Sequence, residues 1–411
     1  MVNNFKSIKD TLELSLVSGT NNKMGNTKQC GKLELLPSAV IYGANASGKT
    51  NVLESFAMMR RIVLNHDKII QSQDKLPYNP FKLSTETENS PTVFDIVFTV
   101  GEIKYKYGFE YDCNTVYAEW LTVYESNRPT TIFEYDIETG YKPNNKIKEV
   151  QKLSKMNNAL YLWELDRKGY KYATDVLAWF NNSSYISSNK ENELSEEFSR
   201  ELLKPETKDF LSALLKEADL GIEGIDSIDI RNGKPKIWTL RKKYDENGKE
   251  AGVSLFDFDE DESLGTQKFF ELLEPITKSL STGSPLFIDE LDANLHPLLA
   301  KKILFTLFHN IEYNKNFAQL IFSTQDTIFL DFDLMHKSQI WFSEKDKVGA
   351  TNITSLVEYK GVTTRMNLKK DYMMGKYGAV PYLGDFSTFL YRKTAAQKKI
   401  LVPIYINKSK K

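Results

Sequence analysis

The sequence predicts an α/β fold with a mostly parallel sheet, and three observations point to it. A short apolar strand, 39–42, leads directly into a glycine-rich loop and then into a segment with apolar residues at helical spacing. A second apolar strand, 286–288, ends in two adjacent acids. The strands at 319–322 and 339–342 follow, with a crossover helix expected over 299–308, as in sheets built from parallel strands.

The composition argues against several classes of protein. In the 411 residues, 54 Lys and Arg balance 55 Asp and Glu, so a wholesale coating of nucleic acid or membrane is not expected. The two cysteines, Cys30 and Cys113, lie far apart without metal spacing, which argues against a disulfide framework or a zinc ribbon. Without a long apolar stretch or an apolar signal core, we expect a globular, cytoplasmic protein that does not contact the membrane.

We expect four parts along the chain. Residues 1–144 form an N-terminal lobe, which starts with a strand pair and includes an antiparallel meander over 92–124, where apolar and polar residues alternate. Residues 145–224 form a helical insertion. Residues 225–386 form a C-terminal lobe, and 387–411 form a basic tail.

The glycine-rich loop matches the phosphate-loop pattern in full. Its glycines let the backbone wrap so that N–H groups point at a β-phosphate, and the following helix start adds a positive field. Lys49 would bridge the β- and γ-phosphates, and the Thr50 hydroxyl would ligate Mg²⁺. The expected nucleotide-binding residues here are Gly43, Ala44, Asn45, Ala46, Ser47, Gly48, Lys49, Thr50 and Asn51.

Asp289 and Glu290 supply the acids that a phosphate loop needs. Asp289 would hold the Mg²⁺ shell, and Glu290 would polarise the attacking water as a general base. Adjacent carboxylates at a strand end are also common in solvated turns. The phosphate loop elsewhere in the chain favours the catalytic interpretation.

The residues around the loop resemble the SMC, RecF and ABC type of ATPase. Asn45 and Ser47 lie inside the loop, and Thr50-Asn-Val-Leu-Glu54 follows it. The resemblance implies a signature motif that a second subunit presents in trans. Ser263, Gly265 and Thr266 open a helix one element before Asp289, where this class carries that motif, and its serine and N–H groups would bind a γ-phosphate across a dimer interface. A simple N-cap role for Ser263 is the alternative.

The same resemblance assigns a switch position to Gln325. The stretch 291–297 resembles the D-loop of this class, which usually ends its next strand with a histidine that senses the γ-phosphate. A glutamine side chain donates a hydrogen bond but cannot be protonated. We therefore expect slow or regulated hydrolysis, with Lys49, Glu290 and Gln325 as the catalytic residues.

Taken together, the motifs resemble the RloA/AbiLi group of ABC-like ATPases, over roughly residues 1–386. The resemblance implies an ABC-type ATPase head built from both ends of the chain, with ATP and Mg²⁺ as ligands. It also implies a phage-defence role similar to that of overcoming-lysogenization ATPases and the PARIS ATPase subunit. Such a protein would form a homodimer or higher oligomer, respond to a phage protein and control a Toprim-type (RloB-like) effector nuclease. The stretches that carry the resemblance are 4–8, 43–51, 263–266, 290–297, 339–346 and 376–381.

Two other functions remain alternatives. A RecF-like repair ATPase would bind DNA directly, and the basic tail is the best candidate for such contacts. A self-contained nuclease would need a Toprim metal site, for which Asp331 and Asp333 are the best pair, but no fitting Glu strand precedes them. The acidic run 257–262 is expected to be a solvated loop, with a regulatory contact as the alternative.

Overall fold

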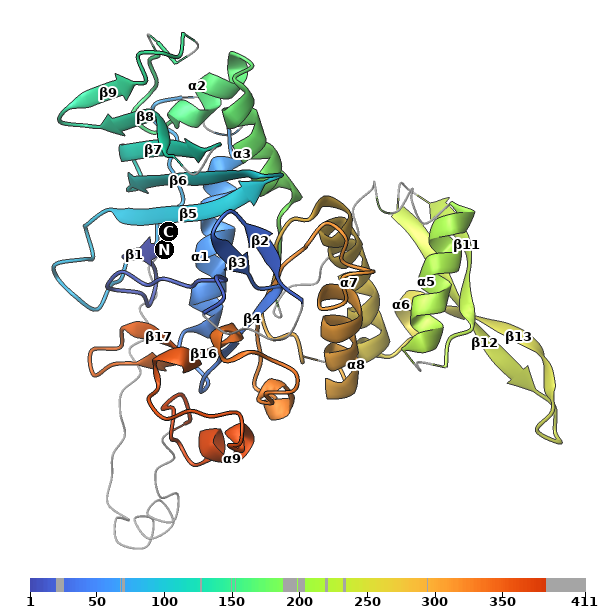
Figure 1. The fold of residues 1–411 in the computed structure, drawn as a ribbon. Coiled ribbons are helices and arrows are strands. Elements are labelled where there is room, and N and C mark those ends of the chain that lie inside the picture. Colours follow the sequence, from blue (N-terminus) through green and yellow to red (C-terminus); the bar gives the residue numbers. More distant parts are fainter. Residues whose placement is uncertain are drawn as a thin grey trace, which may run out of the picture.

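The computed structural model describes most of the chain, and Figure 1 shows its arrangement. The predicted basic tail, 387–411, lies outside the described residues, as does Asn294. The described residues are 1–19, 26–66, 68, 71–125, 128–148, 150–151, 153–187, 198, 204–218, 221–231, 234–293 and 295–381.

The central sheet is mostly parallel, in the strand order β10-β14-β15-β4-β16-β17. Every neighbouring pair is parallel except β16 and β17. All five residues of β4 are buried, as expected for a strand covered on both faces. The predicted α/β fold class is therefore confirmed. The strands are β10 (Ser184–Ile186), β14 (Leu286–Ile288), β15 (Leu320–Ser323), β4 (Ser38–Tyr42), β16 (Ile340–Lys345) and β17 (Thr351–Ser355).

Helices flank this sheet. The helix α1 (Lys49–Val63) follows the glycine-rich loop and buries the face that the apolar spacing predicted. The expected crossover helix begins earlier, because proline suits a first helical turn: α8 (Pro297–Lys302) continues into the π-helix η1 (Ile303–Phe308). None of the helices in the described ranges is both long and apolar enough to cross a bilayer. The other described helices after residue 262 are α7 (Leu264–Thr282), η2 (Thr327–Phe329), η3 (Lys337–Gln339), η4 (Leu356–Glu358) and α9 (Leu368–Met373).

A second sheet has six antiparallel strands in the order β1-β5-β6-β7-β8-β9. It confirms the predicted meander, which is β5 to β7, and adds β8 and β9 on one side and β1 on the other. The expected strand pair at the chain start is reduced to β1, because the chain turns back through the short bridge Phe5–Ile8. Figure 1 shows α1 between the two sheets. The strands are β1 (Val2–Asn3), β5 (Thr92–Val100), β6 (Ile103–Tyr111), β7 (Val116–Tyr124), β8 (Thr130–Asp136) and β9 (Gly140–Pro143).

The stretch expected as a helical insertion, 145–224, also supplies a strand of the central sheet. Among its described residues the helices are α2 (Tyr161–Arg167), α3 (Lys171–Asn182) and α5 (Pro205–Glu217). Between α3 and α5, β10 pairs in parallel with β14. The sequence prediction missed this strand because three residues are too short to show a period. This stretch is therefore partly built into the central sheet.

The acidic run 257–262 is only in part the solvated loop that the sequence suggested, since Asp259, Glu260 and Asp261 are exposed. It forms the short helix α6 (Phe258–Asp261), and the acids at both ends of the run are buried. Asp257 pairs with Lys236, and Glu262 accepts hydrogen bonds from Thr239 and Arg241. Charge patterning reveals the acids but not their distant partners, which come from β12. The small sheets are β11 (Gly224–Arg231), β12 (Lys234–Tyr244) and β13 (Glu250–Asp257), and β2 (Lys28–Cys30) with β3 (Leu33–Leu35).

A buried carboxylate joins the antiparallel sheet to α2. The Glu119 carboxylate accepts hydrogen bonds from the backbone N–H groups of Tyr161 and Leu162, at 2.6 and 3.0 Å, and from the Tyr107 hydroxyl at 3.0 Å. Burial raises the pKa of Glu119 to about 7, although these hydrogen bonds and the charge of Lys155 oppose the shift. Between pH 4.5 and about 7, the folded protein therefore keeps a proton on Glu119 that the unfolded chain releases.

We predict that Glu119→Gln flattens the pH dependence of stability between pH 4.5 and 7. Since the pKa is raised on folding, the contribution of Glu119 is complete below the unfolded pKa and is lost as the pH rises towards 7. The loss is up to roughly 3 kcal/mol in the free energy of unfolding. Urea denaturation of both proteins at pH 5 and pH 7.5 measures it, and an equal pH dependence in both would contradict the prediction.

Candidate nucleotide-binding site

The glycine-rich loop lies between the end of β4 and the start of α1, and its shape depends on both predicted glycines. A Cβ added to Gly43 would come within 2.6 Å of the Ser343 carbonyl oxygen. Gly48 has a φ of 107°, and a Cβ there would overlap the Thr351 side chain. Ala46 also lies in the left-handed region, with a φ of 63°. The loop is therefore packed against β16 and β17 where only glycine fits.

A chain of hydroxyl and amide groups holds this loop from behind. The Ser47 carbonyl accepts hydrogen bonds from the Thr351 hydroxyl at 3.0 Å and the Ser343 hydroxyl at 3.2 Å. The Thr351 and Ser7 hydroxyls lie 2.7 Å apart, and the Asn51 amide donates to Ser7 at 2.6 Å. This series of hydrogen bonds runs from Asn51 through Ser7 and Thr351 to the loop, and it joins segments from both ends of the sequence. Sequence reasoning missed the roles of Ser7, Ser343 and Thr351, because nothing local marks them.

Lys49 is almost fully buried inside the loop. Its ammonium group donates to the carbonyl oxygens of Gly43, at 2.8 Å, and Ala44, at 3.2 Å. Burial lowers the pKa of Lys49, and the carboxylates of Glu290 and Asp289 oppose this shift. A cation is thus held at the loop, close to acids from β14, as the phosphate-loop pattern predicted.

Asp289 and Thr50, the two predicted metal ligands, are brought together. The Thr50 hydroxyl donates to Asp289 Oδ2 at 2.8 Å, and the Ser323 hydroxyl donates to Oδ1 at 2.7 Å. Burial raises the pKa of Asp289, while both hydrogen bonds oppose the shift. A hydroxyl and a carboxylate oxygen suit Mg²⁺, which one or two carboxylates and substrate phosphates commonly bind. Within the described ranges, no larger group of acids, His and Cys could hold a metal ion.

Glu290 and Gln325 also meet, although they end different strands. The Gln325 side-chain amide donates to Glu290 Oε1 at 3.2 Å. The Glu290 backbone has a φ of 53°, an uncommon left-handed conformation for a non-glycine residue, and its N–H donates to the Ser323 hydroxyl at 2.8 Å. Ser323 therefore contacts both Asp289 and Glu290. Sequence reasoning missed it, although a serine ending the strand before Gln325 was a possible signal.

The candidate signature residues lie apart from this cluster. Ser263 caps α7, and its hydroxyl accepts a hydrogen bond from the Thr266 N–H at 3.2 Å. This is the N-cap that was the alternative interpretation. In the described part of the chain, no hydrogen bond joins Ser263, Gly265 or Thr266 to the loop or to Glu290. Ser263 is exposed, and its neighbour Leu264 is 71% exposed.

The loop fits a bound nucleotide on two observations. The close packing at Gly43 and Gly48 leaves a side-chain-free cradle of backbone beside the Lys49 ammonium group. The Ser47 hydroxyl is buried and has no hydrogen-bond partner among the residues that the structure describes. Such an orphaned polar atom is costly unless a ligand or water satisfies it. Phosphate oxygens are suitable acceptors for it.

We predict that Thr351→Val weakens ATP binding about five- to tenfold, because the Ser47 carbonyl loses one donor, worth about 1 kcal/mol. Titration calorimetry with ATP measures the dissociation constant. Asn352→Ala, at an exposed position on the same strand, is the matched control and should bind normally. Equal losses in the two variants would show that the hydroxyl chain does not hold the loop.

The comparisons with known proteins agree with this geometry. A family model described as "AAA domain, putative AbiEii toxin, Type IV TA system" matches residues 38–331, from the start of β4 to beyond Gln325. No curated protein matches the chain. The matched region includes the loop, both acids and the switch position, and it covers well over half of the sequence. The chain therefore belongs to this family of AAA-domain proteins, which are ATPases of the AAA/ABC class.

Proposed function

We propose that this chain is a Mg²⁺-dependent ATPase in which two copies close around two ATP molecules and thereby regulate a partner. One observation carries the proposal most directly. Residues from the two ends of the sequence meet in one cluster, where Thr50 contacts Asp289 at 2.8 Å and Gln325 contacts Glu290 at 3.2 Å. These are the groups that ATP hydrolysis on a phosphate loop requires.

Each side chain has a role that follows from its position. Lys49 would exchange the loop carbonyls for the β- and γ-phosphates of ATP. Thr50 and Asp289 would hold Mg²⁺, which neutralises phosphate charge when bound. Glu290 would take a proton from the attacking water, and the Gln325 amide would keep its carboxylate in position.

The signature residues would act on the nucleotide of a second copy. Ser263 and the N-terminal N–H groups of α7, a 19-residue helix, are at the surface and do not contact their own loop among the described residues. Glu262, directly before Ser263, is buried and paired with Arg241, so the start of α7 is held on a rigid support. A γ-phosphate from another subunit would meet a preformed group of donors there.

The wider role we propose is that of a sensor and regulatory subunit in anti-phage defence. It would respond to a phage protein and control a separate Toprim-type effector nuclease. The resemblance of the motifs to the RloA/AbiLi group supports this role, and the family description refers to a toxin system. The RecF-like alternative depends on the basic tail, which lies outside the described residues. The cytoplasmic location stays a prediction.

A subunit-mixing experiment tests the shared site. Lys49→Ala and Ser263→Arg should each abolish hydrolysis, because each breaks both sites of a homodimer. Mixed in equal amounts, they form heterodimers with one intact site, so we expect recovery of about a quarter of the unmodified rate. No recovery, with both variants folded and a dimer present in the mixture with ATP and Mg²⁺, would show that Ser263 acts within its own chain or not at all.

Light scattering provides the companion measurement. Glu290→Gln should bind ATP without hydrolysing it, so its mass should double with ATP and Mg²⁺ and stay unchanged without them. Adding Lys49→Ala to this variant should abolish the change. An assembly that ignores nucleotide would remove the ATP-driven switch while leaving the ATPase site itself in place.

We also predict that Gln325→His raises the steady-state rate by about tenfold or more, because an imidazole can exchange protons near neutral pH. The rate of the variant should depend on pH between 5.5 and 7.5 more steeply than that of the unmodified protein. Gln325→Ala is the control, and its steady-state rate should not rise. A Gln325→His rate equal to the unmodified one would mean that this position does not limit hydrolysis.

A further inference from the structure

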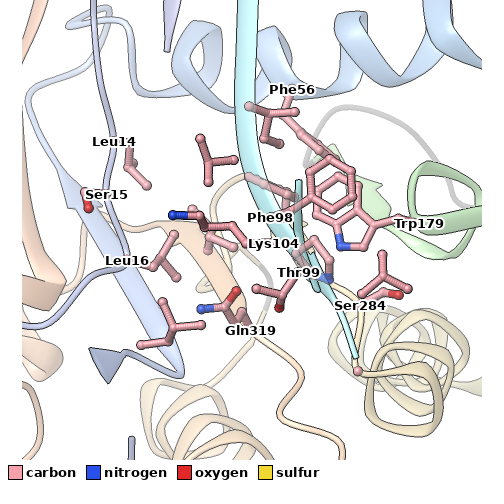
Figure 2. A pocket seen from close by; sticks show the side chains of 18 of the residues that line it. Leu14, Ser15, Leu16, Phe56, Phe98, Thr99, Lys104, Trp179, Ser284 and Gln319 are labelled. Atoms are coloured by element: carbon pink, nitrogen blue, oxygen red, sulfur yellow. The ribbon is translucent and has the colours of Figure 1, made fainter. Parts of the chain in front are cut away.

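A large cavity lies away from the nucleotide site. Its volume is about 910 Å³, within the usual range of ligand pockets. Pro285 and Gln319, directly before β14 and β15, form part of its wall, whereas Asp289 and Gln325 follow the other ends of these strands. The cavity therefore lies at the opposite edge of the central sheet, between that sheet and β5 (Figure 2).

The cavity runs along an unpaired edge of β5. Asp95 exchanges two backbone hydrogen bonds with Met1, at 2.8 and 3.1 Å, so its N–H and C=O point away from β6. The β5–β6 ladder is regular, and in such a ladder alternate residues point their backbone groups to the same side. The N–H and C=O groups of Val97 and Thr99 therefore face the cavity. Among the described residues they have no hydrogen-bond partner.

The space beside this edge is one strand wide. Val2 pairs with Phe94 on one side and with Leu12 on the other, so a single strand fits between β5 and the segment that follows Leu12. Beyond Met1 the same gap continues as the cavity. Figure 2 shows Leu14 and Leu16 on one side of it and Phe98 on the other. Since neighbouring strands lie about 4.8 Å apart, the gap can accept one more strand.

The two faces of the gap differ in chemistry. On one face, aromatic rings form stacked pairs: Phe98 with Trp179 at 4.1 Å and Phe56 with Phe287 at 3.9 Å. On the other face, Lys104 lies opposite Thr99 across the β5–β6 ladder. Its ammonium group is 4.0 Å from the Tyr124 ring, and it has no ion pair within the described ranges. An occupying strand would place apolar side chains on the aromatic face and an acid on the lysine face.

We propose that this cavity is the docking site for an extended segment of a partner protein, which adds a strand to β5 at Val97 and Thr99. The segment would alternate apolar and acidic residues, because strand side chains alternate between the two faces. Residues 96–100 of β5 carry no charge, proline or bulge of the kind that protects free strand edges. This proposal does not depend on ATP hydrolysis or on the trans role of Ser263.

The test uses the full chain and a fluorescein-labelled peptide, Val-Glu-Val-Glu-Val-Glu-Val, as the probe. Fluorescence anisotropy should show saturable binding, and hydrogen exchange should show that the peptide slows exchange in β5. Thr99→Pro should weaken binding at least about tenfold, because it removes an N–H that faces the gap. That N–H is not used by β6, so the fold should tolerate the proline. Thr99→Val keeps the N–H and is the matched control.

A second variant separates charge from backbone pairing. Lys104→Glu should weaken binding of this peptide and strengthen binding of Val-Lys-Val-Lys-Val-Lys-Val. Absence of binding by either peptide would overturn the proposal. Binding that Thr99→Pro leaves unchanged would also overturn it, since the peptide would then contact only the apolar wall. Self-association of the chain that Thr99→Pro abolishes would identify a second copy as the occupant and would reject a partner protein.

Discussion

The Asp289 carboxylate is the point at which the parts of the candidate site are joined. Its two oxygens accept hydrogen bonds from Thr50 at the start of α1 and from Ser323 at the end of β15, while Asp289 itself directly follows β14. The group is buried, and its raised pKa shows that the two donors do not fully replace water. A cation at this position would remove that cost. The same contact that organises the site therefore also prepares it for a metal ion.

Glycine and hydroxyl groups complete the arrangement by fixing the loop in space. Gly43 and Gly48 allow the loop to lie against β16 and β17, and Thr351 and Ser7 then bind its backbone. Ser7 comes from the first turn of the chain and Thr351 from one of its last strands. The loop has its shape only when both ends of the chain are folded together. This dependence is expected of the predicted ATPase head, which would be built from both ends of the chain.

The helix α1 connects the two sites discussed above. Its first residues, Lys49 and Thr50, belong to the nucleotide site, and Val52 and Phe56 line the cavity beside β5. The two regions thus share one rigid element without sharing any residue. A strand added to β5 would pack near the side of the helix whose end holds the phosphate loop. Binding at one place and nucleotide occupancy at the other can be measured separately.

The sequence by itself determined the features that depend on neighbouring residues. The phosphate loop, the buried strand ending in Asp289 and Glu290, and the meander of β5 to β7 are local patterns of glycine, charge or alternation, and the structure shows each of them. The resemblance to ABC-type ATPases also placed Gln325 and Glu290 in one catalytic site, and their side chains lie 3.2 Å apart.

Only the tertiary structure decided the contacts whose partners lie far apart in the chain. No local sequence pattern predicts that Ser323 binds both acids or that Ser7 and Thr351 meet behind the loop. The same is true of the burial of Glu262 against Arg241. The same holds for β10, which is too short to show a period, and for the edge of β5 at Val97 and Thr99, which lies beyond the pairing with β1. A sequence records which groups can form hydrogen bonds and which are apolar. Folding alone decides which polar groups find hydrogen-bond partners and which apolar groups become buried.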